Sequence, residues 1–440
     1  MNKTIAYIVS NPGVNDARVI KMAHAAAKKG YKVHLFGTLK PGFDAFEEIE
    51  NITFYRYEWK PINILFEKSL FFQLVRFINK KFAIYLAKKM LPYIKYFLFS
   101  SIYADEISKI NPDLIHAHDL ICLPTAKHAS TINNVPYIYD AHELEIHRNP
   151  PLPWLQKMYV KYIETKYSKD ASCVITVGRY VANELAKHLP NAKIEVLYNS
   201  PIRNESPYKL RKDLKIADNK KILLYVGKVA MGRGIEEIIK ILPSLSSDII
   251  FATVGPFDPK QKALLEKMAE KYKVTSRFTI LPPVPYDKVV DYIKDADLGI
   301  ISVQPVTLSY QYSMPNKLFE LSFARVPIIS NELDEIQEFL EEHNNGIAID
   351  INNMIYLTHY ISKLMKTKEK YIMSDDQYEN LVQQYSWEKQ LEKLFVIYSN
   401  TLGLDHQKLE LTTEDIKLRS IGKILNQSEF DPVRAGLVDS

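Results

Sequence analysis

A glycine-bearing stretch in the second half of the chain has the residue types of a phosphate-binding loop. It reads VGKVAMGRGIEEII over residues 226–239, and its glycines are Gly227, Gly232 and Gly234. Glycines let a backbone approach an anion closely, and the start of the following helix adds positive potential. Lys228 and Arg233 would then stabilise a diphosphate. Alternatively, the glycines serve only a tight turn and both cations are solvated.

The spacing in this stretch excludes two common nucleotide-binding motifs. Arg233 and Gly234 stand where a Walker A loop has Lys followed by Ser or Thr, so the hydroxyl that binds magnesium is missing. The glycines are also wrongly spaced for the GxGxxG dinucleotide fingerprint. The stretch therefore matches neither motif, and a phosphate site of another kind and a simple turn both remain open.

A second stretch, YSMPNKLFELSFARVPII at residues 312–329, places a lysine and a glutamate at the start of a predicted helix. Pro315 or Asn316 begins that helix, so Lys317 lies in its first turn, beside N–H groups that can bind phosphate. Glu320 shares a face with Lys317 and can accept hydrogen bonds from a ribose diol. The alternative is an ordinary surface ion pair between these two side chains.

Polar side chains also follow two predicted strands in the first half. His116 and His118 alternate along DLIHAHDL, which Asp119 ends, and they form either a His-x-His metal site or hydrogen-bonded histidines at a strand edge. His142 and Glu143 directly follow YIYDA. A histidine there suits acid/base chemistry or substrate contact, although a lone histidine is as often structural. These positions matter because open α/β sheets bind ligands beyond the carboxyl ends of their strands.

Sheets must position these residues, and the hydrophobic pattern predicts two of them. Short β-branched runs alternate with helical patterns, which predicts an α/β fold with parallel sheets. Asn15 or Asp16 caps a helix that ends near Gly30. A polar, proline-bearing segment at residues 200–218 separates the halves. The expected strands are TIAYIVS, YKVHLFG, ITFYRY, DLIHAH, PYIYDA, SCVITV and IEVLYN, then KILLYVG, IIFATVG, FTILPPV, LGIISV, VPIIS and GIAID.

Bulk composition bounds the class of protein. The chain has 440 residues, enough for two domains, and its 47% hydrophobic and 25% charged residues are typical of a globular protein. Its two cysteines, Cys122 and Cys173, argue for a reducing compartment and against a disulfide scaffold. The apolar run at the start is too short for a signal peptide and reads as the first core strand. We therefore expect a cytoplasmic protein.

The segment from Lys60 to Ser100 is basic and aromatic. It holds eight Lys or Arg residues and ten Phe or Tyr residues, with Glu67 as its one acid. No uncharged run there reaches the roughly 18 residues of a membrane span. Two interpretations remain open: helices lying on an anionic membrane surface, or a pair of core helices with solvated lysines. Nucleic acid is not expected, because the net charge is only +5 and no nucleic-acid motif is found.

In their order and spacing, several fragments resemble the family-4-type retaining glycosyltransferases with the GT-B fold, of the bacterial surface-polysaccharide type. The resemblance covers about residues 1–400 and is carried by NDARVIKMAHAAAKKGYKVHLF, HAHD, YDAHE, YVGKVAMGRGIEEII and PNKLFELSFARVPII. It implies two facing Rossmann-like domains. The implied parts are an acceptor-side domain at 1–205, a nucleotide-sugar domain at 206–385, a crossover helix at 386–402, and a tail at 403–440 without an assigned role.

The resemblance also implies roles for single residues. Lys228 and Arg233 would hold the donor diphosphate, and His142 would lie by the transferred sugar as the third catalytic residue. Glu320 would bind the ribose, and Lys317 would lie near the phosphates. The other implied donor-binding residues are Gly13 in the loop from Pro12 to Val14, Gly227, Tyr312, Asn316 and Leu318.

Three positions depart from the family pattern. Tyr312 stands where many members have the first glutamate of Glu-x7-Glu, which puts that contact to the donor sugar in question. The sequence ARVP replaces the frequent Ala-Gly-x-Pro, and the loop at Gly13 has one glycine where relatives often have two.

The implied activity is the transfer of a hexosyl or N-acetylhexosaminyl group from a nucleotide diphosphate sugar, and the expected donor is a UDP-sugar. The transfer would retain the anomeric configuration and need no metal or other cofactor. The acceptor would be a glycan or a lipid-linked molecule. On the membrane-surface interpretation of residues 60–100, the protein would reach it at the inner face of the cell membrane. Two alternatives remain open. One is a nucleotide-sugar epimerase or phosphorylase on the same fold, and the other is an inactive nucleotide-sugar-binding protein, which the Tyr312 departure keeps in consideration.

Overall fold

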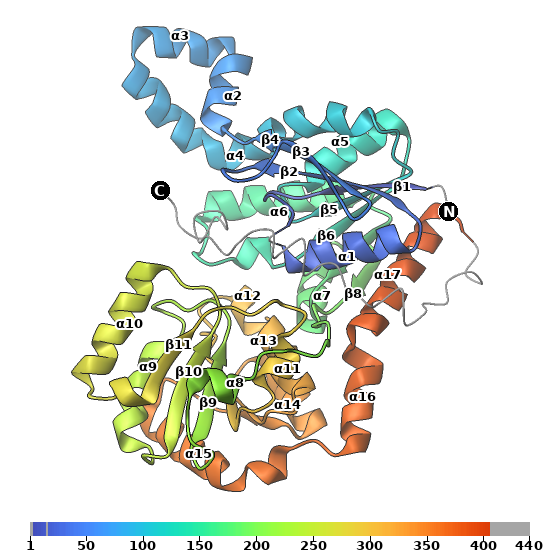
Figure 1. Ribbon diagram of the computed structural model, residues 1–440. Helices are drawn as coiled ribbons and strands as arrows, with labels where there is room; N and C mark the ends of the chain where they lie inside the picture. Colours follow the sequence, from blue (N-terminus) through green and yellow to red (C-terminus); the bar gives the residue numbers. More distant parts are fainter. Residues whose placement is uncertain (1–2, 15, 405–440) are drawn as a thin grey trace. The chain divides into compact units, whose positions relative to one another are not determined.

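The chain folds into two compact units, seen in a computed structural model that describes residues 3–14 and 16–404 (Figure 1). The first unit runs to Leu197 and includes the described residues from Leu391 onward, and the second is Tyr198–Gln390. The chain thus enters the second unit at Tyr198, against a predicted domain start at residue 206. Each unit is built on one mainly parallel sheet, which confirms the predicted pair of Rossmann-like folds.

The first unit has an eight-stranded sheet in the order β3-β4-β2-β1-β5-β6-β7-β8. Neighbouring strands pair in parallel except β3 and β4. All seven predicted strands of this half are present, and β3 is an addition. The strands are β1 (Thr4–Ile8), β2 (Lys32–Leu39), β3 (Phe46–Ile49), β4 (Ile52–Glu58), β5 (Leu114–His118), β6 (Tyr137–Ala141), β7 (Cys173–Thr176) and β8 (Ile194–Val196).

Helices connect these strands. Asp16 caps α1 (Ala17–Lys28) by accepting the N–H of Val19, and the helix ends just before Gly30, as predicted. The others that bear on function are α5 (Leu123–Asn133), the short 3-10 helix η1 (Glu145–His147), α6 (Trp154–Ser168) and α7 (Arg179–Ala186). Because β1, β5 and β6 are parallel, the loops that follow them emerge at one edge of the sheet.

Residues 61–108 form a helical arm of three helices: α2 (Pro61–Lys68), α3 (Leu70–Ile78) and α4 (Lys80–Ser108). Ser69 and Asn79 separate the helices, and each caps the next one through its side chain. An apolar cluster that includes Leu65, Phe72 and Ala87 holds the three together. In Figure 1, α2 and α3 project away from the sheet. Among the described residues, no helix has the length and hydropathy needed to span a bilayer.

The second unit has a six-stranded parallel sheet in the order β11-β10-β9-β12-β13-β14. All six predicted strands are present: β9 (Lys221–Val226), β10 (Ile249–Val254), β11 (Phe278–Leu281), β12 (Leu298–Ile301), β13 (Ile328–Ser330) and β14 (Gly346–Ala348). The strand order reverses between β9 and β12. In a doubly wound sheet this reversal opens the crevice where ligands bind.

The helices of the second unit cover its sheet, and the core between them is apolar. The helices next to the switch point are α9 (Ile235–Ile241), α12 (Leu308–Gln311) and α13 (Asn316–Phe323); the others are α8 (Leu210–Leu214), α10 (Pro259–Lys271), α11 (Val289–Ile293), α14 (Asp334–His343), α15 (Met354–Thr367) and α16 (Asp375–Tyr385). The final helix α17 (Trp387–Leu402) is continuous, and the division between the units falls within it at Leu391. Most of the predicted tail at 403–440 lies outside the described residues.

Candidate functional site

The glycine-bearing loop of the second unit lies at the switch point of its sheet. It leaves β9 at Gly227 and enters α9 after Gly234, which has a φ of +79°. A Cβ on Gly234 would lie 2.2 Å from the Cβ of Ser302, at the end of β12. Only glycine therefore allows the loop to run this close to the neighbouring strand.

Both cations of this loop are exposed, while its backbone is held from behind. The hydroxyl of Tyr225 donates to the carbonyl of Lys228 at 3.1 Å, and the hydroxyl of Ser302 donates to the carbonyl of Arg233. The side chains of Lys228 and Arg233 therefore face solvent on a fixed loop. The N–H of Gly232 donates to the carboxylate of Glu236, so this backbone donor already has a partner.

Lys317 reaches the same loop from α13. This helix begins at Asn316, as predicted, and Pro315 provides no side-chain cap. The Nζ of Lys317 lies 3.8 Å from the centroid of the Tyr225 ring, and a Cβ on Gly227 would be 3.4 Å from that Nζ. The two stretches singled out in the sequence thus meet in one crevice.

The crevice is electrostatically prepared for an anion. Burial lowers the pKa of Lys317 to about 7, and nearby Arg233 adds to this effect while Glu320 opposes it. Burial and the neighbouring cation together outweigh the charge of Glu320, so the charged form of Lys317 is disfavoured without a further anion. A bound phosphate would restore the full charge of Lys317.

The remaining predicted donor residues are spread around the start of α13. Tyr312 is the C-cap of α12 and is half-buried, as is Glu320, whereas Asn316 is exposed. Leu318 lies in the core, and its N–H donates to the carbonyl of Pro315 at 2.9 Å. The contacts of these residues to a donor stay predictions.

In the first unit, the predicted polar residues join a buried network that centres on Asp140. Arg18 donates to both carboxylate oxygens of Asp140 at 2.9 Å and to the carbonyl of Leu197 at 2.8 Å. Arg18 is 3% exposed and Asp140 is fully buried. The Nδ1 of His118 lies 3.4 Å from Asp140 and 3.1 Å from the Nε2 of His142. Neither Arg18 nor Asp140 was singled out from the sequence.

His142 is held as a cation by this network. Burial by itself lowers the pKa of His142, but Asp119 and Asp140 outweigh it and raise the pKa to about 9. Its Nδ1 lies 3.3 Å from Asp119, and its Nε2 lies 3.6 Å from Asp140. At neutral pH, His142 is therefore a hydrogen-bond donor at both nitrogens rather than a general base.

We expect this charge to make the stability of the first unit depend on pH. A pKa raised from about 6.5 in the unfolded chain contributes stability that is complete below pH 6.5 and is lost as pH rises through about 9. The unfolding free energy of the protein should therefore fall between those pH values by more than that of His142→Gln. Urea titrations of both proteins across this range test it, and parallel pH profiles would contradict it.

His116, His118 and Asp140 bring possible metal-ligand atoms within 4.8 Å of one another. Both oxygens of Asp140 already accept hydrogen bonds from Arg18, however, and a metal ion would add its charge to those of Arg18 and protonated His142. Burial lowers the pKa of both histidines, and the Nδ1 of His116 pairs with the hydroxyl of Tyr398 at 2.8 Å. This cluster fits the hydrogen-bonded alternative better than a metal site.

The loop at Gly13 follows β1 in the same sheet. Gly13 and its neighbours Pro12 and Val14 are buried, and the N–H of Gly13 donates to the side chain of Asn11 at 2.7 Å. A Cβ on Gly13 would lie 2.5 Å from a methyl carbon of Leu35. The glycine is thus required by packing, and its contact to a donor stays a prediction.

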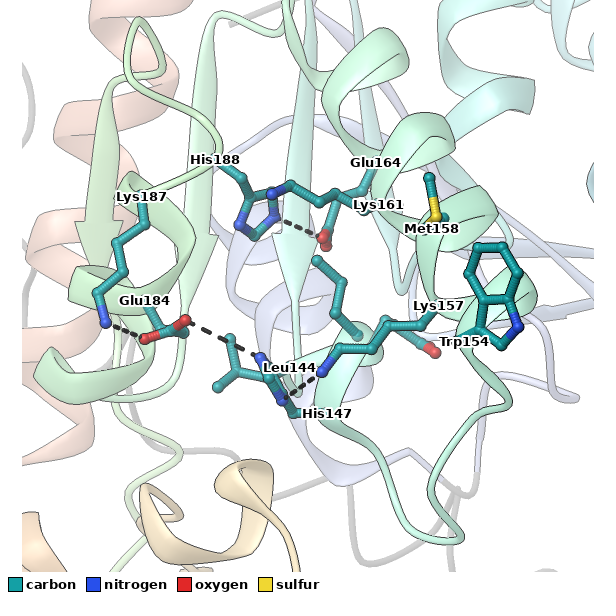
Figure 2. Close-up of a pocket in the computed structure, with 12 residues that line it drawn as sticks. Leu144, His147, Trp154, Lys157, Met158, Lys161, Glu164, Glu184, Lys187 and His188 are labelled. Carbon is teal, nitrogen blue, oxygen red and sulfur yellow. Dashed lines mark hydrogen bonds and ion pairs between the residues drawn. The ribbon is translucent and has the colours of Figure 1, made fainter.

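The first unit also contains a cavity of about 310 Å³ (Figure 2). Its lining begins at Leu144, two residues after His142 in the sequence. A row of polar contacts crosses it. Lys187 forms an ion pair with Glu184, and Glu184 lies 3.9 Å from the Nε2 of His147. The Nδ1 of His147 in turn lies 3.4 Å from the Nζ of Lys157. Trp154 and Met158 stand at its apolar side (Figure 2). The other lining residues are Leu144, Glu145, Ile146, Lys161, Glu164 and His188.

Glu145 is the perturbed acid of this cavity. Burial, and then the charge of nearby Glu143, raise the pKa of Glu145 to about 7. A pocket with convergent polar groups and a shifted carboxyl group is a candidate binding site. This cavity was not predicted from the sequence, although Glu145, His147 and Trp154 follow the predicted Glu143 within a dozen residues.

Known families match both units. The model of the family described as Glycosyltransferase Family 4 matches residues 17–200, and that of Glycosyl transferases group 1 matches residues 208–383. An uncharacterized glycosyltransferase of Methanocaldococcus jannaschii is 21% identical over 302 residues, which are 65% of this chain and 75% of the relative. The first match contains Arg18, Asp140 and His142, and the second contains the loop from Gly227 to Gly234 together with Lys317.

Solved structures resemble the whole fold. Sucrose-phosphate synthase from Thermosynechococcus elongatus has a TM-score of 0.69 and 16% identity, covering 91% of this chain and all of the other. HepE from Anabaena in complex with UDP-glucose has a TM-score of 0.67 and 13% identity, covering 90% of this chain and 99% of the other. At these identities, the likeness shows the fold.

Proposed function

We propose, from the premise that this chain is a glycosyltransferase enzyme with the GT-B fold, that it transfers a sugar from a UDP-sugar to a glycan or lipid-linked acceptor, with retention and without a metal. One observation carries the donor side of this proposal. Lys317 of α13 and the loop with Lys228 and Arg233 meet at the switch point of the second unit. The complex of the Anabaena relative with UDP-glucose supports the choice of donor.

The proposed reaction breaks the bond between the anomeric carbon and the diphosphate and forms a bond from that carbon to an acceptor oxygen. Negative charge grows on the departing diphosphate, and the acceptor proton passes to it. Lys228, Arg233 and Lys317 would stabilise that charge more strongly in the transition state than in the bound donor. Attack on the face that the diphosphate leaves would give retention.

The crevice at the switch point favours a charged diphosphate over a neutral nucleoside. Lys317 is only partly protonated near pH 7, because burial and Arg233 lower its pKa. A diphosphate raises that pKa by direct charge interaction, so binding takes up a proton. A nucleoside without phosphates gains none of this interaction and should bind much more weakly.

Other residues would select the sugar and the nucleotide. In this proposal, Glu320 accepts the hydroxyls of the ribose, and Tyr312 contacts the sugar where many family members use a carboxylate. His142 would lie by the transferred sugar, with its ring nitrogens directed to Asp119 and to Asp140 and His118. The charge that Asp119 and Asp140 maintain on His142 would add positive potential beside the sugar.

The acceptor would bind the first unit. The cavity beyond His142 supports this, because it combines an aromatic side chain at Trp154 with lysines and carboxylates that can bind hydroxyls (Figure 2). The protein would work in the cytoplasm, at the inner face of the membrane. Contact with an anionic membrane through residues 60–100 completes the proposal.

A thermal-shift and hydrolysis screen tests the proposed donor. UDP-sugars should raise the Tm by several degrees at about 100 times their Kd, in the presence of EDTA, because binding at that level adds about 2.7 kcal/mol to the unfolding free energy. Slow release of UDP should accompany the shift for the true donor. Uridine is the matched control and should leave the Tm unchanged. The absence of a shift with every nucleotide sugar would contradict the proposal.

A further inference from the structure

The outer face of α3 is apolar and open to solvent. Leu70, Phe71, Leu74, Phe77 and Ile78 are exposed by 77%, 57%, 65%, 91% and 83%. Their spacing puts all five on one side of the helix. The other side, with Phe72 and Val75, packs into the cluster that joins the three helices of the arm. A helix that is apolar on both sides is normally buried, so this face is built to be covered.

The neighbouring surface of the arm is basic. Lys80 and Lys81 follow α3 at the start of α4. Arg76 lies on the other side of α3, where its guanidinium is 5.2 Å from the centroid of the Phe66 ring. Lys88 and Lys89 lie two turns further, beside the exposed rings of Phe82 and Tyr85. Glu67 is the one acid from residue 60 to residue 100. An apolar ridge bordered by cations fits a surface with an apolar interior and anionic head groups.

We propose that α3 inserts its outer face into an anionic lipid monolayer, with Lys80 and Lys81 at the head groups. Lipid accounts for both features of the surface, since acyl chains cover the apolar ridge and phosphates neutralise the cations. A second copy of the chain would account only for the apolar ridge and would leave the cations without partners. In a symmetric dimer the same patch faces itself, which would bring like charges together.

This inference deepens the proposed function, because it names the surface that would bring the enzyme to a lipid-linked acceptor. It also specifies the mode of contact. Adsorption by charge alone would leave the apolar side chains of α3 in water, whereas insertion would remove Phe77 and Ile78 from water. The two modes respond differently to salt and to loss of the apolar side chains.

Vesicle sedimentation with the full chain tests the surface. The protein should bind phosphatidylcholine vesicles that contain phosphatidylglycerol, and replacing Phe77 and Ile78 with serine should weaken binding by about 100-fold. Replacing Lys80 and Lys81 with glutamine should reduce binding by at least about tenfold and remove the preference for the anionic lipid. Ile355→Ser is the matched control, because Ile355 of the second unit is 79% exposed and should not contribute.

The depth of insertion has its own readout. The variant Phe77→Trp should show a blue-shifted emission on anionic vesicles and quenching by brominated acyl chains. Unchanged emission, or equal binding of the serine variant and the protein, would overturn insertion. Self-association that disappears in the serine variant, without vesicle binding, would assign the face to a second copy and overturn the proposal. None of these readouts needs a nucleotide sugar, so they remain informative if the proposed reaction fails.

Discussion

Replacing Arg233 with alanine is expected to lower kcat/KM for the UDP-sugar by about 100-fold to 1,000-fold, the range found when one preorganised donor to a developing anion is removed. Arg233 is exposed on a loop that Tyr225 and Ser302 hold in place through backbone carbonyls. Its guanidinium is close enough to Lys317 to lower the pKa of that lysine. Removing it therefore deletes charge from the crevice without disturbing the core.

The control for this variant is Lys267→Ala, which removes an exposed cation from α10 in the same unit. Both variants should keep the Tm and the circular dichroism of the protein, and only Arg233→Ala should lose transfer. A further readout is the pH dependence of UDP binding. Without Arg233 the pKa of Lys317 should rise, so proton uptake on binding should decrease near pH 7. Near-normal transfer by Arg233→Ala would reject the phosphate assignment.

Replacing Asp140 with alanine is expected to lower the unfolding free energy of the first unit by about 3–5 kcal/mol, since it leaves a buried arginine without its carboxylate. Arg18 is 3% exposed and directs two of its hydrogen bonds to Asp140. Although burial alone would raise the pKa of Asp140, Arg18 and then His142 hold it well below its usual range. This stability is present above the ordinary pKa of about 3.9 and is lost as pH falls through the lowered value.

A double variant separates lost pairing from lost packing. The pair Arg18→Met with Asp140→Leu removes both charges, and it should recover most of the stability that the single variant loses. Glu58→Ala is the surface comparison, because the Glu58–Lys60 pair is exposed and should contribute less than about 1 kcal/mol. Urea unfolding followed by tryptophan fluorescence measures all three. A cost below about 1 kcal/mol for Asp140→Ala would contradict the account of the network.

Much of the architecture follows from local sequence pattern. Alternation of β-branched runs with helical periods predicted every strand of both sheets except β3, which is short, partly exposed and carries two glutamates. The helix start at Asn316 was also predictable, because proline favours the first turn of a helix. The loop from Gly227 to Gly234 was predictable as well, because its three glycines lie close together in the sequence, directly after an apolar strand.

Residues that act across the fold could not be found in this way. Tyr225 lies within an apolar strand, and nothing in its neighbours shows that its ring will support Lys317 from α13. Arg18 and Asp140 are 122 positions apart, and they pair only because the start of α1 and the end of β6 meet at one sheet edge. The exposed face of α3 was undetermined too, since the same aromatic residues would suit a buried helix.

Calorimetric titration of UDP into the full chain, with EDTA present, is the most direct measurement of the central claim that the second unit binds a nucleoside diphosphate through Lys228, Arg233 and Lys317. The account predicts binding with uptake of protons near pH 7, at least about 100-fold weaker in the double variant Lys228→Ala, Arg233→Ala. Uridine should bind far more weakly than UDP. Equal affinity of the protein and the double variant for UDP, or no binding of UDP to either, would contradict the claim.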